Sequence, residues 1–142
     1  MSNPLATYGN IPDILRIEEA ILKLPQVDLP LDHYQIPGVY VRRMFMPQGT
    51  ILTGKIHKFE SIAILAQGTL RIADGDHAYV ITAPAVMVDK PGIKRLGFAE
   101  TDVTFLTVHR CDKERITEIE DYLVTNSFDD YENYLKLLED LP

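Results

Sequence analysis

The chain alternates between two kinds of hydrophobic spacing, and the first is helical. Over residues 11–24, apolar residues recur every three or four positions with charged residues between them. The apolar positions are Ile14, Ile17, Ile21 and Leu24. This spacing predicts an amphipathic helix, in which Pro12 suits the first turn and Pro25 ends the run. Residues 25–37 contain three prolines and predict an extended arm.

The region 38–110 has the pattern of many short strands. Segments rich in Val, Ile, Leu, Phe and Thr alternate there with turn residues. The predicted strands are 39–46, 50–57, 61–66, 69–73, 77–82, 85–89, 93–98 and 103–110. The dipeptide Asp74-Gly75 is a strong hairpin signal between two of them. Many short strands at this spacing predict a β-sandwich or a small barrel.

Residues 112–142 return to helical spacing and carry the acidity of the chain. Two apolar stripes predict two helices that pack on the β-body or on a neighbouring subunit. The stripes are Ile116, Ile119 and Leu123, then Tyr131, Tyr134, Leu135, Leu138 and Leu141. We therefore divide one domain into a helix and arm (1–37), a β-barrel (38–111) and an acidic helical tail (112–142).

Composition and charge exclude several classes of protein. The 142 residues include 14 basic and 21 acidic side chains, and ten of the acids but only three of the bases lie in the tail, so the first 111 residues are neutral. No basic excess favours a nucleic-acid duplex as partner. No apolar run is long enough for a membrane span, no signal peptide is evident, and the single Cys111 cannot form an internal disulfide. We expect a cytoplasmic protein.

Two segments of the middle region resemble the motifs of the cupin superfamily, the RmlC-like proteins with a double-stranded β-helix. The first motif runs from a Gly through His-x-His and a Glu to a second Gly, as the segment from Gly49 to Gly68 does here. Lys55 falls on the first His, His57 on the second His and Ser61 on the Glu. With the helical segments, the resemblance implies a mainly β jelly roll with a short N-terminal helix and two C-terminal α-helices.

The second cupin motif contains Pro and Gly followed by His and Asn positions, and Pro91-Gly92-Ile93-Lys94-Arg95 resembles it. Arg95 then falls on the His position and Ala99 on the Asn position. The chain also resembles small phage and prophage cupin proteins of mostly unassigned function. Those proteins carry similar Leu-Thr-Gly-Lys-Ile-His and Pro-Gly-x-Lys-Arg segments and a last strand that ends in His, which is His109 here.

The motif positions disfavour a metal. The resemblance to metal-binding cupins implies three His and one Glu that converge inside the barrel. Those four positions are occupied here by Lys55, His57, Ser61 and Arg95. Lys and Arg repel a divalent cation, and Arg keeps its proton, so we expect neither a metal nor another cofactor. A metal site would require His57, Glu60 and His109 to converge in a way that the motif does not indicate.

The basic substitutions instead predict a pocket for an anion. If Lys55 and His57 share the inward face of one strand, they meet Arg95 in one concave space, with Lys94 near its rim. Unpaired buried charge is costly, so such a space needs an anionic ligand. The chemistry favours a nucleotide or a sugar phosphate. In the alternative interpretation, Lys55 or Arg95 pairs with an acidic residue at the barrel mouth and His57 belongs to the core.

Other side chains are candidates for the same pocket. His109 shares one face of its strand with Thr107, and the rings of Tyr40 and Phe59 could stack on a base, although aromatic residues at such positions more often belong to the core. Arg42 and Arg43 point to opposite faces, so at most one of them lines a pocket.

Three functional classes follow. The leading interpretation is a non-enzymatic phage protein that sequesters a nucleotide signal of host immunity. The alternatives are an RmlC-like, metal-independent sugar-nucleotide epimerase, with His57 as base and Tyr40 or Tyr79 as acid, and a scaffold whose acidic helices bind a partner. We expect a homo-oligomer, because cupin sheets present broad faces and the arm 25–37 is suited to exchange.

Overall fold

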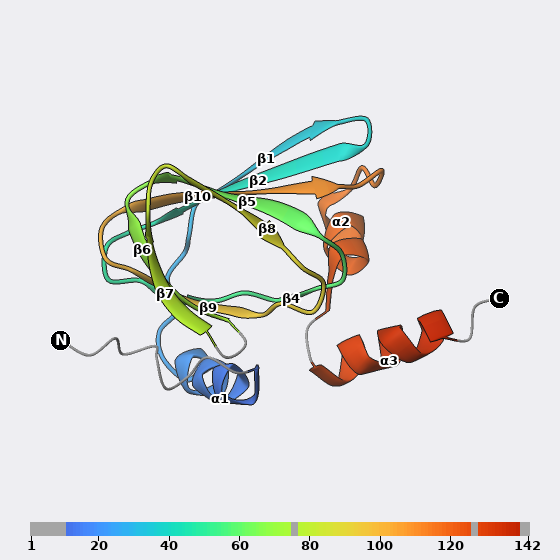
Figure 1. Ribbon diagram of the computed structural model, residues 1–142, viewed down its shortest axis with the longest axis horizontal. Helices are drawn as coiled ribbons and strands as arrows, with labels where there is room; N and C mark the ends of the chain where they lie inside the picture. The colour runs from blue at the N-terminus through green and yellow to red at the C-terminus, as the bar shows by residue number, and fades with distance from the viewer. Residues whose placement is uncertain (1–10, 75–76, 126–127, 140–142) are drawn as a thin grey trace.

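Two antiparallel sheets face each other and form a barrel around an apolar core (Figure 1). The computed structural model describes residues 11–74, 77–125 and 128–139. The five-stranded sheet has the order β1 (Leu31–Ile36), β2 (Val39–Met46), β10 (Val103–Arg110), β5 (Ser61–Gln67) and β8 (Ala85–Asp89). The four-stranded sheet has the order β3 (Ile51–Thr53), β9 (Arg95–Ala99), β6 (Thr69–Asp74) and β7 (His77–Thr82).

Successive side chains along each strand point alternately into the barrel and away from it. Apolar side chains at inward positions of both sheets form the core. The central core between the sheets consists of fully or nearly fully buried residues from both. These residues are Met46, Leu65, Leu70, Ile72, Ala99 and Val103. The turn between β5 and β6 requires Gly68, which has a φ of +90° and lies so close to the carbonyl of Asp102 that a Cβ would clash.

Helix α1 (Ile11–Leu22) packs on the outer side of the four-stranded sheet (Figure 1). Ile14 is completely buried against Ala73 and Leu96, which are register partners on β6 and β9. A polar contact adds to this packing, because the Glu18 carboxylate accepts hydrogen bonds from Lys94 Nζ at 2.9 Å and from Thr53 Oγ1 at 2.5 Å. The amphipathic pattern of 11–24 thus places the helix on the barrel.

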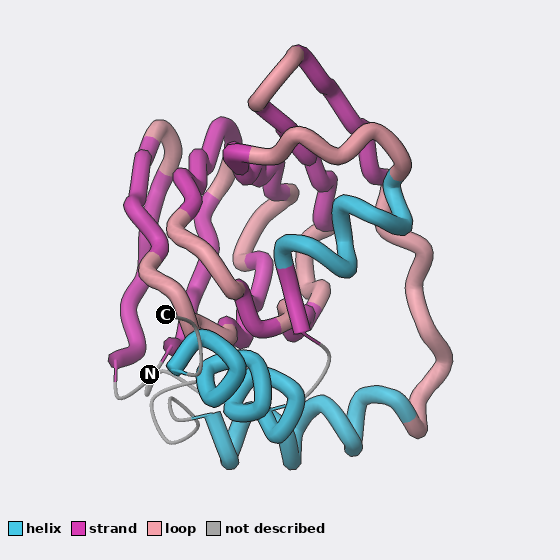
Figure 2. Tube along the Cα trace, turned by 90° about the vertical axis from the view of Figure 1, so that its right-hand side faces the viewer, coloured by secondary structure: helices cyan, strands magenta, loops and turns pink. Residues whose placement is uncertain are grey.

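The acidic tail forms two helices, as the spacing predicts. Helix α2 (Ile116–Leu123) buries Ile119 and Leu123 beside Tyr40, and in Figure 2 it crosses in front of the strands. The chain then forms β11 (Val124–Thr125), which pairs with β4 (Ile56–His57). Helix α3 (Phe128–Glu139) contacts the rest through Tyr131 and Tyr134 of its first turns. The predicted mainly β barrel with one N-terminal and two C-terminal helices is confirmed.

Two local predictions differ from the structure, and one strand pairing was not predicted. Half of the expected arm, Leu31–Ile36, is strand β1, which pairs along its whole length with β2 of the same chain. The expected strand 50–57 is interrupted between Thr53 and Ile56. The pairing of β11 with β4 was not predicted. Gly75 of the expected hairpin lies outside the described residues, but Asp74 and His77 on either side are register partners.

Candidate functional site

The candidate site begins on the inner faces of β2 and β10. Because side chains alternate along a strand, Tyr40, Arg42 and Met44 all point into the barrel. The register of the ladder places Tyr40 opposite His109 and Arg42 opposite Thr107. Side chains that face each other in this way lie close enough to interact. A basic side chain therefore lies inside the barrel among aromatic, imidazole and hydroxyl groups.

Two adjoining compartments occupy this part of the barrel. The inner compartment has a volume of about 90 Å³, and the outer one, which reaches α2, has a volume of about 180 Å³. Both compartments are lined by the same six residues, which are Arg42, Met44, Leu52, Gly54, Lys55 and His57. The inner compartment is otherwise lined mainly by apolar residues, whereas the outer one also contacts Tyr40, His109 and the α2 residues Ile119, Glu120 and Leu123.

The side chain of Arg42 lines both compartments. Within the described part of the chain, its guanidinium forms neither a hydrogen bond nor an ion pair. Its neighbour Arg43 points to the outer face of the sheet and pairs there with Asp32 at 2.8 Å. Arg42 therefore contributes positive potential to the barrel interior, where no acidic group neutralises it directly.

Two imidazoles stand beside this guanidinium. The ring centroids of His57 and His109 are 5.8 Å apart, and the plane of one is tilted by 59° to the other. His109 Nε2 lies 2.8 Å from Thr107 Oγ1, and His57 Nδ1 lies 3.4 Å from Ser61 Oγ. The ring of Tyr40 is stacked 5.9 Å from that of His109. The imidazoles thus keep fixed orientations toward the cavity.

Both imidazoles are neutral at pH 7. Burial, with Arg42 and Arg95 as further causes, lowers the pKa of His57 from 6.5 to about 4. Burial, the neighbouring His57 and Arg42 lower the pKa of His109 to about 4 as well. An anion between Arg42 and the two rings would reverse these effects, because it would stabilise the protonated imidazoles.

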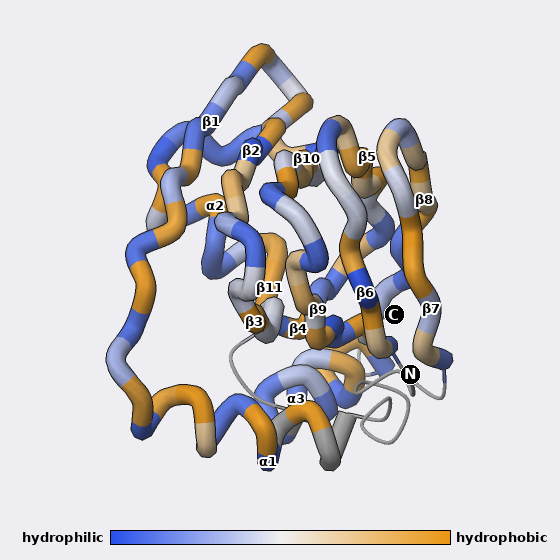
Figure 3. The backbone as a smooth tube through the Cα atoms, turned by 90° about the vertical axis from the view of Figure 1, so that its left-hand side faces the viewer, coloured by the Kyte–Doolittle hydropathy of each residue, from blue (hydrophilic) through white to orange (hydrophobic). Residues whose placement is uncertain are grey.

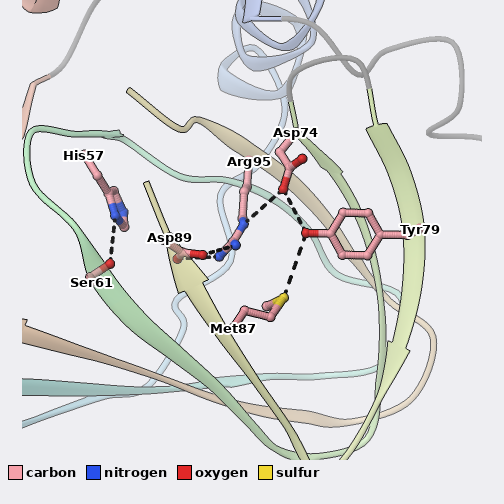
Figure 4. A network of polar contacts seen from close by, with 7 residues as sticks. All are labelled: His57, Ser61, Asp74, Tyr79, Met87, Asp89 and Arg95. Carbon is pink, nitrogen blue, oxygen red and sulfur yellow. Dashed lines mark hydrogen bonds and ion pairs between the residues drawn. The ribbon is translucent and has the colours of Figure 1, made fainter. Parts of the chain in front are cut away.

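Arg95 also lines the inner compartment. Carboxylates hold its guanidinium (Figure 4). Its Nη1 donates to Asp89 Oδ2 at 2.7 Å, its Nη2 donates to Asp89 Oδ1, and its Nε lies 3.6 Å from Asp74 Oδ2. Tyr79 donates its hydroxyl to Asp74 at 2.8 Å, and burial raises the pKa of this Tyr to about 12. The positive charge of Arg95 is therefore balanced inside the protein.

The two lysines differ in how they compare with the prediction, because Lys55 lines the predicted pocket and Lys94 does not. Lys55 lines both compartments from the interruption between β3 and β4, but half of its side chain is exposed and it lies 3.7 Å from Glu120 of α2. Lys94 was expected near the rim, which is wrong. Only 1% of its side chain is exposed, and its Nζ donates to Glu18 and to the carbonyl of Gly54. Lys94 anchors α1 and lines neither compartment.

The two aromatic candidates have different positions. Tyr40 lines the outer compartment, and its hydroxyl lies 2.5 Å from His33 Nδ1. Phe59 lines neither compartment, because it packs against Tyr122 and Tyr134 at centroid distances of 4.8 and 6.3 Å. Phe59 therefore attaches the acidic tail to the barrel. Of these two rings, that of Tyr40 is the one placed to stack on a ligand in the compartments.

A metal does not fit these residues. In the described residues, no three His, Cys, Asp or Glu side chains converge on one point. Glu60, which a site with His57 and His109 would need, is exposed and lies 3.7 Å from Lys90. The two imidazoles share their compartment with Arg42, and a guanidinium repels a divalent cation. The carboxylate that lines this compartment, Glu120, lies 3.7 Å from Lys55.

The sequence predicted that Lys55, His57, Arg95, His109 and Tyr40 lie near one another. It did not decide between Arg42 and Arg43 as a pocket residue. The signal for Arg42 was present, because it lies at even spacing from Tyr40, Met44 and Met46 on one strand face. The partners of Arg95 were not identifiable, because Asp74 and Asp89 come from two other strands.

Comparisons with known proteins match the fold. Neither a protein-family model nor a curated protein sequence matches this chain. A solved cupin superfamily protein from Desulfitobacterium hafniense is 10% identical with a TM-score of 0.52, over 66% of this chain and 86% of that one. An RmlC-like cupin family protein with a double-stranded β-helix from Methanocaldococcus jannaschii is 12% identical with a TM-score of 0.51, over 60% of this chain and 82% of that one.

A protein from Photorhabdus luminescens matches more of the chain, at 14% identity and a TM-score of 0.53, over 82% of this chain and 90% of that one. None of the described helices is long and apolar enough to cross a membrane. At these identities the likeness concerns the arrangement of strands, which agrees with the two facing sheets described above. The chain therefore has the cupin double-stranded β-helix fold.

Proposed function

We propose that the protein is a non-enzymatic binding protein that takes a small anion into the barrel beside Arg42. The observation that carries this proposal is the guanidinium of Arg42, which faces both compartments without an ionic partner among the described residues. A partly buried cation that lacks a partner favours an anionic ligand, since binding supplies the missing charge.

The neighbouring groups support the same ligand. His57 and His109 are neutral at pH 7 and can donate a ring N–H to an anion. Lys55 adds a cation at the mouth, although Glu120 shares it. A charge-assisted hydrogen bond contributes about 1.5–3 kcal/mol, so one guanidinium and two imidazoles suffice for measurable binding of a small anion.

The size of the cavity limits the ligand. An engineered protein cavity of about 150 Å³ holds a benzene molecule. The compartments of about 90 and 180 Å³ therefore suit small ions or short organic acids. A nucleotide, with base, ribose and phosphate, needs more room and requires α2 to move away from the mouth. Sequestration of a nucleotide immune signal by a phage protein stays a prediction from resemblance.

The epimerase alternative has less support. His57 and Tyr40 both line the outer compartment, which is the arrangement a base and an acid would need. However, the pKa of His57 is lowered to about 4, which makes its imidazole a weak base. Tyr79 donates its hydroxyl to Asp74 within the Arg95 network and lines neither compartment. Binding without chemistry accords better with these groups.

Isothermal titration calorimetry at pH 7 tests the proposal, with inorganic phosphate and acetate as probes. We expect wild type to bind at least one of them and Arg42→Gln to bind it at least about tenfold more weakly. Arg43→Gln is the matched control, since Arg43 is the next residue but faces outward. Absence of binding by wild type, or an equal loss in both variants, would contradict the proposal and favour the scaffold alternative.

A further inference from the structure

The compartments also indicate which anion is bound, if the proposed function holds. We propose that the ligand is a monocarboxylic acid with a short apolar chain, its carboxylate beside Arg42, His57 and His109 and its hydrocarbon part in the inner compartment.

The charge of the site restricts the ligand to a single negative charge. Three permanently cationic side chains line the compartments, namely Arg42, Lys55 and Arg95. Lys55 is paired with Glu120, and Arg95 is held by Asp89 and Asp74. Arg42 alone is left without direct compensation among the residues described. One such guanidinium matches one negative charge, whereas a phosphate monoester brings nearly two at pH 7.

The chemistry of the inner compartment restricts the rest of the ligand. The residues that line it alone, apart from Arg95, Thr107 and Gly97, are all apolar. They are Met46, Leu70, Ile72, Ile93 and Phe105. Thr107 Oγ1 already lies 2.8 Å from His109 Nε2. A sugar hydroxyl or a second charged group would lose its hydration there without a new partner, so this wall selects a hydrocarbon.

The shared lining and the volume of the inner compartment limit the length of the ligand. The inner and outer compartments share Arg42 and His57, so a head group beside these residues can extend a chain directly into the apolar space. By comparison with the cavity that holds benzene, a volume of about 90 Å³ suits about four carbon atoms. The acid that fits best therefore has about five carbons in all.

A homologous series of ligands tests this inference. Calorimetry at pH 7 compares acetate, propanoate, butanoate, pentanoate, hexanoate and octanoate, together with inorganic phosphate and adenosine monophosphate. Each methylene that enters the apolar compartment is expected to raise affinity by about fourfold. We expect the affinity to rise up to pentanoate or hexanoate and to fall at octanoate. 1-Pentanol, which has the tail without the charge, is expected to bind at least about tenfold more weakly than pentanoate.

The outcomes separate this inference from the proposed function. Absence of binding of every anion overturns both. Binding of phosphate or acetate that depends on Arg42, without any gain along the acid series, overturns only the ligand class. Tighter binding of adenosine monophosphate than of pentanoate also overturns the ligand class and indicates that α2 opens.

Two variants locate the hydrocarbon chain. The Cβ added by Gly97→Ala lies 3.6 Å from Leu70 Cδ1 as its nearest contact, which is ordinary packing, so the variant is expected to fold. Its methyl group shortens the inner compartment and should move the optimum to an acid one carbon shorter. Ile72→Val removes a methyl group and should move the optimum to a longer acid. An unchanged optimum in both variants contradicts the placement of the chain.

An independent observation concerns the outer face of the five-stranded sheet. We infer that this face binds a second copy of the chain. The outward residues of an antiparallel sheet that faces water are usually polar, but here most are apolar. The most exposed among them are Tyr34, Ile36, Ile62, Val86 and Val88. Among the described elements no helix lies over this face (Figure 1), and Figure 3 shows the hydrophobic run along β8.

The extent and charge of this face fit a self-association surface. Five strands about 4.8 Å apart and about five residues long cover a plane of roughly 400 Å². The accessible area of the face is larger, because side chains protrude from this plane, and it approaches that of small specific interfaces. A groove at one end contains Glu60 and Arg110 together with Ile62 and Val88. Opposite charges within one face allow it to complement a copy of itself.

Sedimentation velocity tests this second inference on the full chain. We expect wild type to sediment as a dimer at tens of micromolar. The variant Ile62→Lys/Val88→Lys, which changes a directly paired position of β5 and β8, should be monomeric. Val80→Lys on the other sheet, where Val80 is 50% exposed, is the control and should stay dimeric. A monomeric wild type, or dissociation by Val80→Lys alone, overturns the inference.

Discussion

Asp89 of β8 and Arg95 of β9 join the two sheets of the barrel through a doubly hydrogen-bonded ion pair. The Asp89 side chain is completely inaccessible, and its Oδ2 accepts from Arg95 Nη1 at 2.7 Å. Since β8 is the edge strand of the five-stranded sheet and β9 belongs to the four-stranded sheet, the pair closes the barrel on this side. Arg95 is thereby a structural residue, held as Figure 4 shows, that also lines the inner compartment.

Loss of this pair should destabilise the fold. Asp89→Asn removes the charge that balances Arg95, and breaking a buried ion pair costs about 3–5 kcal/mol. We expect a decrease near 3 kcal/mol in the free energy of unfolding, because Asp74 stays beside Arg95. Urea denaturation measures it. Asp32→Asn, at the exposed pair with Arg43, should cost less than about 1 kcal/mol. Equal effects would show that the buried pair does not hold the sheets together.

Removal of the acidic group at the mouth should strengthen anion binding. Glu120 lines the outer compartment and lies 3.7 Å from Lys55, so Glu120→Gln frees that lysine and removes a repulsive charge. We expect affinity for acetate or phosphate to rise severalfold in calorimetry, with stability changed by less than about 1 kcal/mol because the pair is exposed. Glu118→Gln on the same helix is the control and should leave affinity unchanged. A fall in affinity in Glu120→Gln would place the anion elsewhere.

Lys94 is buried beside Glu18 and does not lie at the rim of the pocket, so its loss should reduce stability more than anion binding. Lys94→Met removes the buried partner of Glu18 and should weaken the attachment of α1, with a loss of a few kcal/mol of stability. Hydrogen exchange in α1 should become faster. Anion affinity should change less than twofold, because Lys94 lines neither compartment. A tenfold loss of affinity in a folded Lys94→Met protein would show that the lysine serves the ligand.

The two buried imidazoles should make stability depend on pH. Their pKa values are about 4 in the folded protein and 6.5 as the ordinary value. Between these values the unfolded chain binds protons that the folded chain does not, so the free energy of unfolding falls as the pH is lowered from about 6.5 to 4. Each imidazole contributes on the order of 3 kcal/mol to this fall. Urea midpoints measured across this range should change less in His57→Gln/His109→Gln, and an identical profile would contradict the prediction.

Most of the fold was predictable because its local patterns are regular. The strand segments between Val39 and Arg110 are rich in Val, Ile, Leu, Phe and Thr and are separated by turn residues, so seven of the eight predicted segments correspond to single strands. The eighth, 50–57, is divided because the chain leaves the sheet around Gly54 and Lys55. β1 was missed because its outward residues include charges and its neighbours are prolines, a composition that also describes an unpaired arm.

The candidate site was less predictable, because its chemistry depends on pairing between distant strands. Spacing along the chain indicated that Lys55, His57 and Arg95 could converge, and all three line the inner compartment. It could not show which cations have partners. In the fold, Arg95 meets Asp74 and Asp89, and Lys94 meets Glu18. Arg42 has no ionic partner among the residues that the structure describes.

The most direct test of anion binding beside Arg42 is an NMR titration of the two imidazoles with 1-butanesulfonate, which stays ionised over the whole pH range. With ¹⁵N-labelled histidine, the pKa values of His57 and His109 are measured with and without saturating sulfonate. The proposal predicts values near 4 without the anion and a rise of at least about one unit with it, in wild type and Arg43→Gln but not in Arg42→Gln. Saturating binding that leaves both pKa values unchanged would contradict it.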